Sequence, residues 1–143
     1  MASGTLTTTD TADGSGFYEI LSISGNRNGV AITGLYPTGL SIPGNEPFTG
    51  DNLIRVAGPD QLTVHGLGFS LADGTYSNPF YAYFLTPATY LEVLTNGTSI
   101  VTELPITFSA SLVPVPEPTS LALVVSGLMA VGWSRRLKKT QQS

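Results

Sequence analysis

The sequence predicts an all-β body followed by one apolar helix near the C-terminus. Three observations carry this prediction. Short segments rich in β-branched and aromatic residues recur along the chain, turn-forming residues separate them every ~8 to 15 residues, and no helical period precedes the C-terminal segment. About nine such strands suit an antiparallel β-sandwich or flattened barrel. We assign residues 1–113 to this domain and residues 114–143 to a C-terminal anchor segment.

Composition supports a turn-rich β domain and argues against a nucleic-acid partner. Only 11% of the residues are charged, and 16 glycines and 10 prolines supply turns. All ten acidic residues lie at or before Glu117, whereas only Arg27 and Arg55 of the six basic residues do, so this part carries −8 and the remainder +4. Phosphate binding requires clustered cations, which an acidic body lacks. The absence of cysteine excludes disulfides and thiolate metal sites.

The first three strands are predicted from side-chain type and one hairpin turn. Residues 4–11 contain a run of threonines, and residues 17–24 combine aromatic with branched aliphatic side chains. Residues 30–35 follow as the partner strand. Asn28-Gly29 predicts the turn before it, because these residues accept positive φ angles.

The central part alternates between irregular and strand-like segments. Residues 36–48 contain three prolines and predict a long loop. Residues 53–56 predict a strand, and residues 66–71 predict another. Asp73-Gly74 then predicts a turn.

Four more strands are predicted before the C-terminal segment, at residues 80–85, 90–94, 99–103 and 106–112. The first of them is strongly aromatic, and the last alternates apolar with small or polar residues at a period of two. Asn96-Gly97 predicts a hairpin between the second and the third. This dipeptide also begins a glycosylation sequon, but the turn is the interpretation that we favour.

The C-terminal segment has a Pro-rich break, an uncharged apolar run and a basic cluster, in that order. The 16 residues from Thr119 to Ser134 make about 24 Å of helix, against a hydrocarbon core of about 30 Å. Snorkelling cations and local thinning of the bilayer compensate for this deficit. The apolar side chains of this predicted membrane span are Leu121, Leu123, Val124, Val125, Leu128, Met129, Val131 and Trp133.

Cations at the end of the span predict its orientation. The stop-transfer cluster consists of Arg135, Arg136, Lys138 and Lys139. Such clusters stay cytoplasmic, which places the N-terminal body outside. A buried core helix in a soluble protein is the alternative, because its length overlaps that of this segment. The lack of a polar stripe favours the membrane.

The start of this segment carries a family resemblance. Val115-Pro116-Glu117-Pro118, followed at once by a short apolar span and the Arg135-Arg136 pair, resembles the PEP-CTERM sorting signal of bacterial surface proteins. The resemblance implies recognition by an exosortase, a membrane-embedded, cysteine transpeptidase-like enzyme, which cuts near this sorting motif and releases or transfers the body.

The resemblance has further implications for the source and the export of the protein. The strand layout of the body is similar to one that recurs in cyanobacterial PEP-CTERM proteins, and the family is associated with biofilm or exopolysaccharide-producing bacteria. Its members normally begin with a secretory signal peptide. Residues 1–7 hold neither a basic nor an apolar region of that kind. We therefore expect a start upstream of Met1.

Candidate catalytic and metal-binding groups are scattered along the chain. His65 is the only histidine, and no Gly-x-Ser-x-Gly elbow surrounds a serine, so a catalytic triad is not predicted. Glu19, Glu92 and Glu103 are isolated and predicted to face solvent, unlike the paired carboxylates of a glycosidase. Turn formation is the favoured role of the remaining acids, and calcium binding stays open for Asp10, Asp13, Asp51, Asp60 and Asp73.

These observations predict a non-enzymatic surface or extracellular-matrix protein without a cofactor. It is expected in the membrane, with its C-terminus cytoplasmic, and at the cell surface or outside the cell after processing. Its predicted partners are an exosortase and the lipid bilayer. The alternative is a glycan- or exopolysaccharide-binding module in which Tyr81, Tyr83 and Tyr90 stack on sugars. Aromatic residues on strands more often form core and cross-strand pairs.

Overall fold

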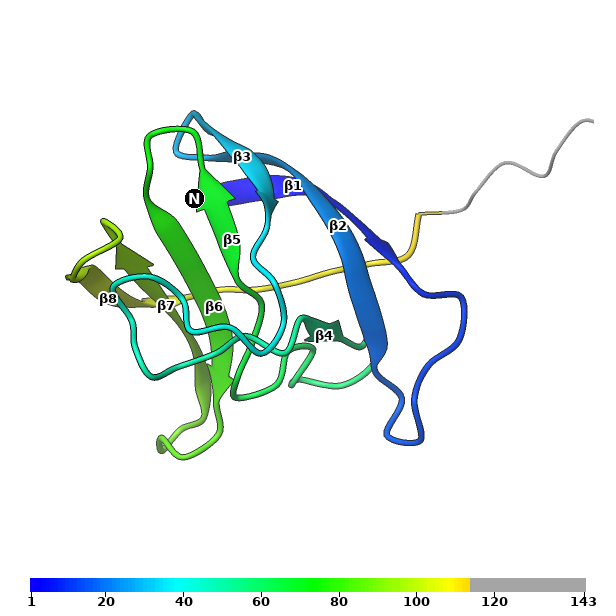
Figure 1. Cartoon of the computed structure of the whole chain (residues 1–143). Helices are drawn as coiled ribbons and strands as arrows, with labels where there is room; N and C mark the ends of the chain where they lie inside the picture. The colour runs from blue at the N-terminus through cyan, green and yellow to red at the C-terminus, as the bar shows by residue number, and fades with distance from the viewer. Residues whose placement is uncertain (114–143) are drawn as a thin grey trace, which may run out of the picture. The chain divides into compact units, whose positions relative to one another are not determined.

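The computed structural model describes residues 1–113, and its first compact unit spans Met1–Ser111. All regular secondary structure in the described residues is β, which confirms the predicted class (Figure 1). The strands are β1 (Ala2–Thr8), β2 (Tyr18–Arg27), β3 (Val30–Leu35), β4 (Leu53–Ile54), β5 (Phe69–Leu71), β6 (Tyr76–Ala82), β7 (Thr89–Thr95) and β8 (Ile100–Ile106).

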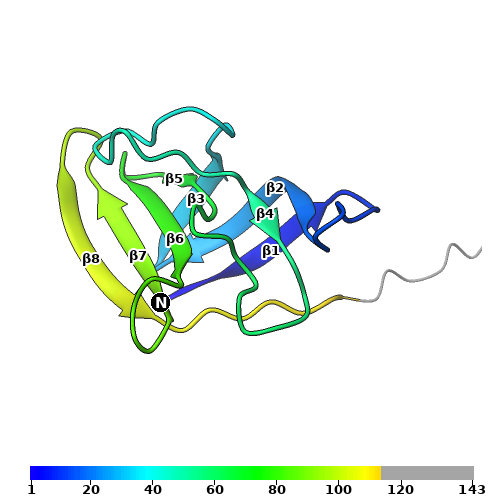
Figure 2. The ribbon, with the colours of Figure 1, turned by 90° about the horizontal axis from the view of Figure 1, so that it is seen from below.

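These eight strands form an antiparallel sheet in the order β1-β2-β3-β5-β6-β7-β8, and β4 pairs with β2 off this path. Apart from β4, each strand pairs with the next one along the chain, mostly through a short connection, whereas β3 and β5 are joined by the long segment at residues 36–68 that contains β4. Figure 2 shows β6, β7 and β8 at one end of this path and β1 and β2 at the other.

The predicted hairpin turns are confirmed. Asn28 and Gly29 join β2 to β3 with φ angles of 49° and 85°, as a tight two-residue turn requires. The Asn96-Gly97 turn joins β7 to β8. There the side-chain Oδ1 of Asn96 accepts the backbone N–H groups of Thr98 and Ser99 at 3.0 and 2.9 Å. The Asn96 side chain therefore holds the turn together.

The aromatic strand begins and ends earlier than the sequence predicted. We expected residues 80–85, whereas β6 is Tyr76–Ala82 and residues 83–85 lie in the turn that follows. The strand begins at Tyr76 because Tyr76 and Ser77 pair with β5. Pro79, which cannot donate to a ladder, lies beyond this pairing with β5.

The predicted strand over residues 106–112 is wrong, because β8 ends at Ile106. The side chain of Gln61 takes the place of a neighbouring strand. Its Oε1 accepts the N–H of Ala110 at 2.8 Å, and its Nε2 donates to the carbonyl of Ala110 at 2.9 Å. Phe108 and Ala110 also pack against the core, which explains the apolar alternation that the sequence shows.

β4 and β5 are both shorter than predicted. For β5 the reason is that the backbone of residues 66–68 bonds with the loop before β4 and with β6. The carbonyl of Gly66 accepts the N–H groups of Asp51 and Asn52, both at 3.0 Å. Gly66 has a φ of +66°, and a Cβ on it would lie 2.1 Å from the carbonyl oxygen of Pro79. Only glycine fits this close approach. Residues 66–68 therefore hold the loop against β6 and do not extend β5.

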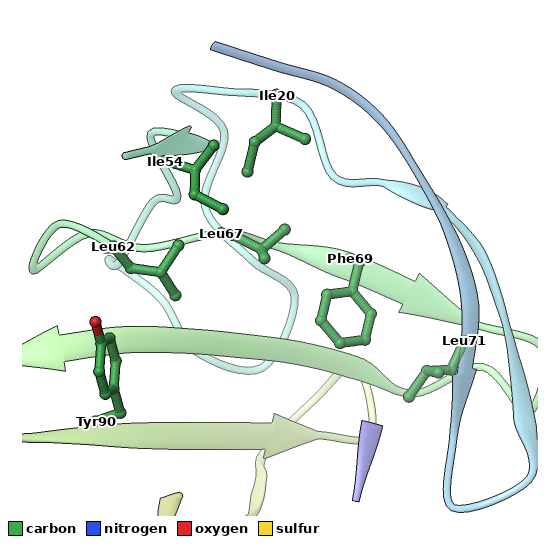
Figure 3. Packing of buried hydrophobic residues seen from close by; sticks show 7 residues of the cluster. All are labelled: Ile20, Ile54, Leu62, Leu67, Phe69, Leu71 and Tyr90. Atoms are coloured by element: carbon green, nitrogen blue, oxygen red, sulfur yellow. The ribbon is translucent and has the colours of Figure 1, made fainter. Parts of the chain in front are cut away.

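The core draws on strands from all parts of the path. Seven buried residues form its centre, and Figure 3 shows them converging between the strands: Ile20, Ile54, Leu62, Leu67, Phe69, Leu71 and Tyr90. Leu6 of β1 and Ile106 of β8 pack against the same cluster. The sheet therefore bends so that both of its ends contact one core.

The predicted loop at residues 36–48 is confirmed as irregular, but part of it forms a tight element over β7. Ser41 bridges Thr49, and the N–H of Ile42 donates to the carbonyl of Phe48 at 3.0 Å. We name residues 41–49 the cover hairpin. Thr95 Oγ1 of β7 donates to the carbonyl of Pro43 at 2.5 Å, and Ile42 is fully buried. This hairpin therefore covers the face of β7 that carries Thr95.

Candidate functional site

The structure does not bring the three predicted sugar-stacking tyrosines onto one exposed face. Tyr81 and Tyr90 are cross-strand partners with ring centroids 5.0 Å apart. Tyr90 is only 9% exposed. Its hydroxyl donates to the carbonyl of Pro59 and accepts the N–H of Gln61, both at 2.7 Å. Burial raises the pKa of this hydroxyl, although the Gln61 N–H acts in the opposite direction. Tyr90 is therefore a neutral core residue.

Tyr83 is the member of this set whose ring is open to solvent. It lies just after β6, is 66% exposed and meets Phe84 edge to face at 5.9 Å. Phe84 is 61% exposed. Two neighbouring aromatic side chains with this exposure form an apolar surface that is available to a ligand.

A half-buried ion pair lies on the same face of β7 as Tyr90. Glu92 accepts hydrogen bonds from Nε and Nη2 of Arg27, both at 2.8 Å, and from Ser77 Oγ at 2.5 Å. The side chains of Arg27 and Glu92 are 15% and 14% exposed. The prediction that Glu92 faces solvent is therefore wrong, whereas Glu19 and Glu103 are exposed as predicted. The sequence did contain a signal for this burial. Glu92 lies two residues after Tyr90 in the same strand, which puts the two side chains on one face.

The partners of Glu92 determine its charge. Burial acts to raise the pKa of this carboxyl, but the hydrogen bonds from Arg27 and Ser77 outweigh it and hold the pKa below the usual range. The hydrogen bond to Glu92 likewise raises the pKa of Arg27. The pair stays ionised and joins β2, β6 and β7, which is a structural role and not that of a proton donor.

The acidic turn residues engage nearby groups and do not converge. Asp13 Oδ1 accepts the N–H groups of Ser15 and Phe17, and Asp60 pairs with Arg55. Thr63 Oγ1 donates to Asp51 Oδ2 at 2.6 Å, and Thr75 donates to Asp73. Across residues 1–113, no three His, Asp or Glu side chains come together as a metal site would need.

A cleft of about 270 Å³ lies on the face of β6 and β7 that is opposite to the face carrying Tyr90 and Glu92. Its lining combines the cover hairpin, the loop before β5, the strands β6 to β8 and the turn after β6. The residues are Asn45, Phe48, Thr49, Val64, His65, Asn78, Phe80, Phe84, Val93, Ile100 and Glu103. Phe80 and Phe84 belong to the aromatic run noticed in the sequence, whereas the other nine residues were not predicted as parts of a binding site.

Two nearly buried carboxamides line this cleft. Asn45 is 5% exposed, and its side chain makes no hydrogen bond to any residue of the described part. Asn78 is 3% exposed. Its Nδ2 donates to the carbonyls of His65 and Leu67, whereas its Oδ1 accepts no hydrogen bond from residues 1–113. The cleft thus offers polar atoms that the surrounding protein leaves unused.

The predicted sorting residues lie outside the described residues. These are the motif Pro116-Glu117-Pro118, the apolar span at residues 121–133 and the basic cluster at residues 135–139. Within the part of the chain that the structure covers, no helix has the length and hydrophobicity needed to cross a membrane.

Comparison with known proteins gives one match. A family model described as the PEP-CTERM protein-sorting motif matches residues 114–136. No curated protein and no solved structure matches the chain. The matched residues include the Pro-Glu-Pro motif, the apolar span and the Arg135-Arg136 pair on which the resemblance was based. The chain therefore carries a PEP-CTERM protein-sorting motif directly after its β-sheet domain.

Proposed function

We propose that the chain is a non-enzymatic surface or extracellular-matrix protein that an exosortase processes at its C-terminal motif. The match to the PEP-CTERM motif at residues 114–136 carries this proposal, because such a motif supports exosortase-targeted sorting of a surface protein. Residues 121–133 hold the protein in the bilayer before processing. The cations at residues 135–139 keep the C-terminus cytoplasmic and leave the β domain outside.

The arrangement of the acidic side chains supports a non-enzymatic role for the β domain. Glu92 is neutralised by Arg27, and Asp60 pairs with Arg55. The exposed Glu19 and Glu103 are on different strands of the sheet, β2 and β8. A hydrolase requires a base or nucleophile held close to a second catalytic group.

The sorting role is tested by replacing the central residue of the motif in the full chain. In a host that makes an exosortase, we expect Glu117→Ala to abolish processing and to leave membrane insertion intact. Immunoblots of membrane and medium fractions measure processing, and alkaline extraction measures insertion. Glu103→Ala removes an exposed carboxylate outside the motif and serves as the matched control. Normal release of the Glu117→Ala variant would count against sorting through the motif.

Glycan binding is a second candidate function, favoured by the exposure of Tyr83 beside Phe84. Aromatic side chains that present their faces to solvent suit stacking on the apolar face of a sugar. We expect Tyr83→Ala to weaken retention of the full chain on a polysaccharide resin and Tyr81→Ala, whose ring packs on Tyr90, to have less effect. Absence of retention on every polysaccharide would remove this candidate.

A further inference from the structure

We propose that the cleft between the cover hairpin and the outer face of β6 to β8 binds a single neutral pyranose unit of a polysaccharide. This inference rests on glycan binding as the second candidate function and assigns the binding to the cleft, which shares Phe84 with the Tyr83 surface but does not include Tyr83. The rim consists of Phe48, Phe84 and Ile100, and the polar floor consists of Asn45 and Asn78.

The floor of the cleft provides unused hydrogen-bonding groups. The carboxamide atoms of Asn45 and the Oδ1 of Asn78 have no hydrogen-bond partner among residues 1–113, and none of these atoms is closed off from solvent. They are therefore open to a ligand that enters the cleft. Hydroxyl groups of a ligand both donate and accept, so one sugar ring satisfies an amide donor and an amide acceptor together.

The local structure holds the backbone at Asn45 and the carboxamide of Asn78 in place. Thr95 Oγ1 binds the carbonyl of Pro43 at 2.5 Å, two residues before Asn45. Gly44 lies so close to the turn after β7 that a Cβ on it would be 2.8 Å from the backbone N of Ser99. Asn78 is fixed by its two hydrogen bonds to the carbonyls of His65 and Leu67. Groups fixed before binding lose little entropy when a ligand arrives.

The rim of the cleft is apolar and open to water. Phe48, Phe84 and Ile100 are 63%, 61% and 50% exposed. Large apolar side chains gathered at one opening mark a binding surface. A pyranose ring has an apolar face of axial C–H groups, which packs on phenyl rings, and hydroxyls at its edge, which reach the polar floor.

The charges near the cleft select a neutral ligand. Glu103 and His65 are the only titratable residues among the lining residues, and neither lysine nor arginine is present there. The two arginines of residues 1–113 are both engaged by carboxylates. An anionic ligand such as a uronic acid polymer would meet Glu103 without a compensating cation. A carboxylate instead accepts hydrogen bonds from neutral hydroxyls.

The size of the cleft selects a small unit. Its volume of 270 Å³ lies just below the ~300–1,000 Å³ of pockets that enclose drug-sized ligands. It is too small for an amphipathic helix, which is about 10 Å wide and needs a long groove. One ring of a polysaccharide fits, and the exposed rim lets the rest of the polymer continue into solvent.

The test uses the full chain in mild detergent, with binding measured by affinity electrophoresis and calorimetry. The probes are two neutral polysaccharides, dextran and galactomannan, and one acidic polysaccharide, alginate. The variants are Phe84→Ala and Asn45→Leu, and Leu40→Ala is a matched control, because Leu40 is 55% exposed and does not line the cleft. We expect each cleft variant to raise the Kd for a neutral probe by about tenfold and the control to leave it unchanged.

The salt dependence of binding and the use of two cleft variants strengthen the test. Binding of a neutral probe is expected to change less than about twofold between about 0.05 and about 0.5 M NaCl. Circular dichroism checks the fold of Asn45→Leu, and the exposed position of Phe84 keeps the test valid if that variant misfolds. Unchanged affinity in a folded Phe84→Ala variant, or preference for alginate, would overturn the proposal.

The outcomes also separate this proposal from the two functions proposed above. Loss of binding in Tyr83→Ala together with full binding in Phe84→Ala would overturn the cleft and retain the tyrosine surface. If the wild-type chain retains none of the probes, both glycan proposals fail. The sorting proposal is unaffected by either result, because processing of the Glu117→Ala variant tests it separately.

Discussion

The two faces of β6 and β7 contrast within one pair of strands. On the inner face, Tyr90 has its hydroxyl bonded on both sides, and Glu92 accepts three hydrogen bonds. On the outer face, Asn78 and Asn45 line a cleft and retain polar atoms that no described residue binds. The inner face is closed by protein, whereas the outer face is only partly covered.

This contrast suggests that the inner face stabilises the fold and that the outer face binds a ligand. Residues whose bonding capacity is used by the fold, such as Glu92 and Tyr90, have nothing left to offer a ligand. Residues whose polar atoms have no protein partner but remain open to solvent, such as Asn45, keep hydrogen-bonding groups that a ligand can use. We therefore expect substitutions on the inner face to change the free energy of unfolding and those on the outer face to change binding.

Leu62→Ala should cause the largest loss of stability among the substitutions on the inner face. Leu62 is 1% exposed and belongs to the cluster that contains Tyr90. Removing its side chain leaves a cavity, so we expect the free energy of unfolding to fall by about 3 kcal/mol. Urea unfolding followed by circular dichroism measures this change. Leu40→Ala, at a 55% exposed position, should stay within about 0.5 kcal/mol. Equal effects at the two positions would contradict the core described here.

Glu92→Gln should have the next largest effect, because it leaves the Arg27 guanidinium half-buried without a counter-charge. We expect a loss of about 2 kcal/mol in the free energy of unfolding. Glu103→Gln, on the neighbouring strand but exposed, is the matched control and should cost less than about 0.5 kcal/mol. The double variant Arg27→Met/Glu92→Met should recover most of the loss. If it is as unstable as the single variant, the unpaired charge is not the cause.

The pH dependence of stability gives an independent measure of the same pair. The pKa of Glu92 is lower in the folded chain than its usual value of 4.5, because the hydrogen bonds from Arg27 and Ser77 outweigh burial. Its contribution is therefore complete above about pH 4.5 and is lost as the pH falls through the folded-state pKa. Urea midpoints measured from pH 7 to about pH 3 should show this acid slope in wild type, and the slope should be smaller in Glu92→Gln.

Tyr90→Phe should have a smaller effect, because the ring stays in the core and only the hydroxyl is removed. The carbonyl of Pro59 and the N–H of Gln61 then lose a partner. We expect a loss of about 1.5 kcal/mol in the free energy of unfolding. Tyr83→Phe removes an exposed hydroxyl and should change the stability by less than about 0.5 kcal/mol. Identical unfolding curves for the two variants would show that the bonds of Tyr90 contribute nothing.

The sequence predicted the all-β class and the hairpin turns because these features depend on local chemistry. Asn28-Gly29 adopts positive φ angles wherever it occurs in a tight turn. It did not predict the pairing of Arg27 with Glu92, which are 65 residues apart in the chain. Such a contact depends on how the sheet bends, and no local pattern encodes that bend. The predicted strand at residues 106–112 failed for a related reason, because the side chain of Gln61 replaced a neighbouring strand.

The candidate site was the least predictable part. Asn45 lies in a segment whose prolines indicated only a loop, and its burial results from the cover hairpin packing on β7. Among the aromatic residues, the register of β6 and β7 turns Tyr81 and Tyr90 toward the core and leaves Phe80 facing the cleft. A shift of one residue exchanges the two faces of a strand. The sequence could therefore identify an aromatic cluster but not its exposed members.

Phe84→Ala should have the smallest effect on stability, and it tests most directly whether the two faces of β6 and β7 differ. Because Phe84 is 61% exposed, we expect the free energy of unfolding to change by less than about 0.5 kcal/mol. Leu62→Ala, at a buried position, should be several times more damaging. Urea unfolding of both variants measures the ratio. A loss of more than about 1.5 kcal/mol in Phe84→Ala would show that this ring supports the fold, and the outer face would then resemble the inner one.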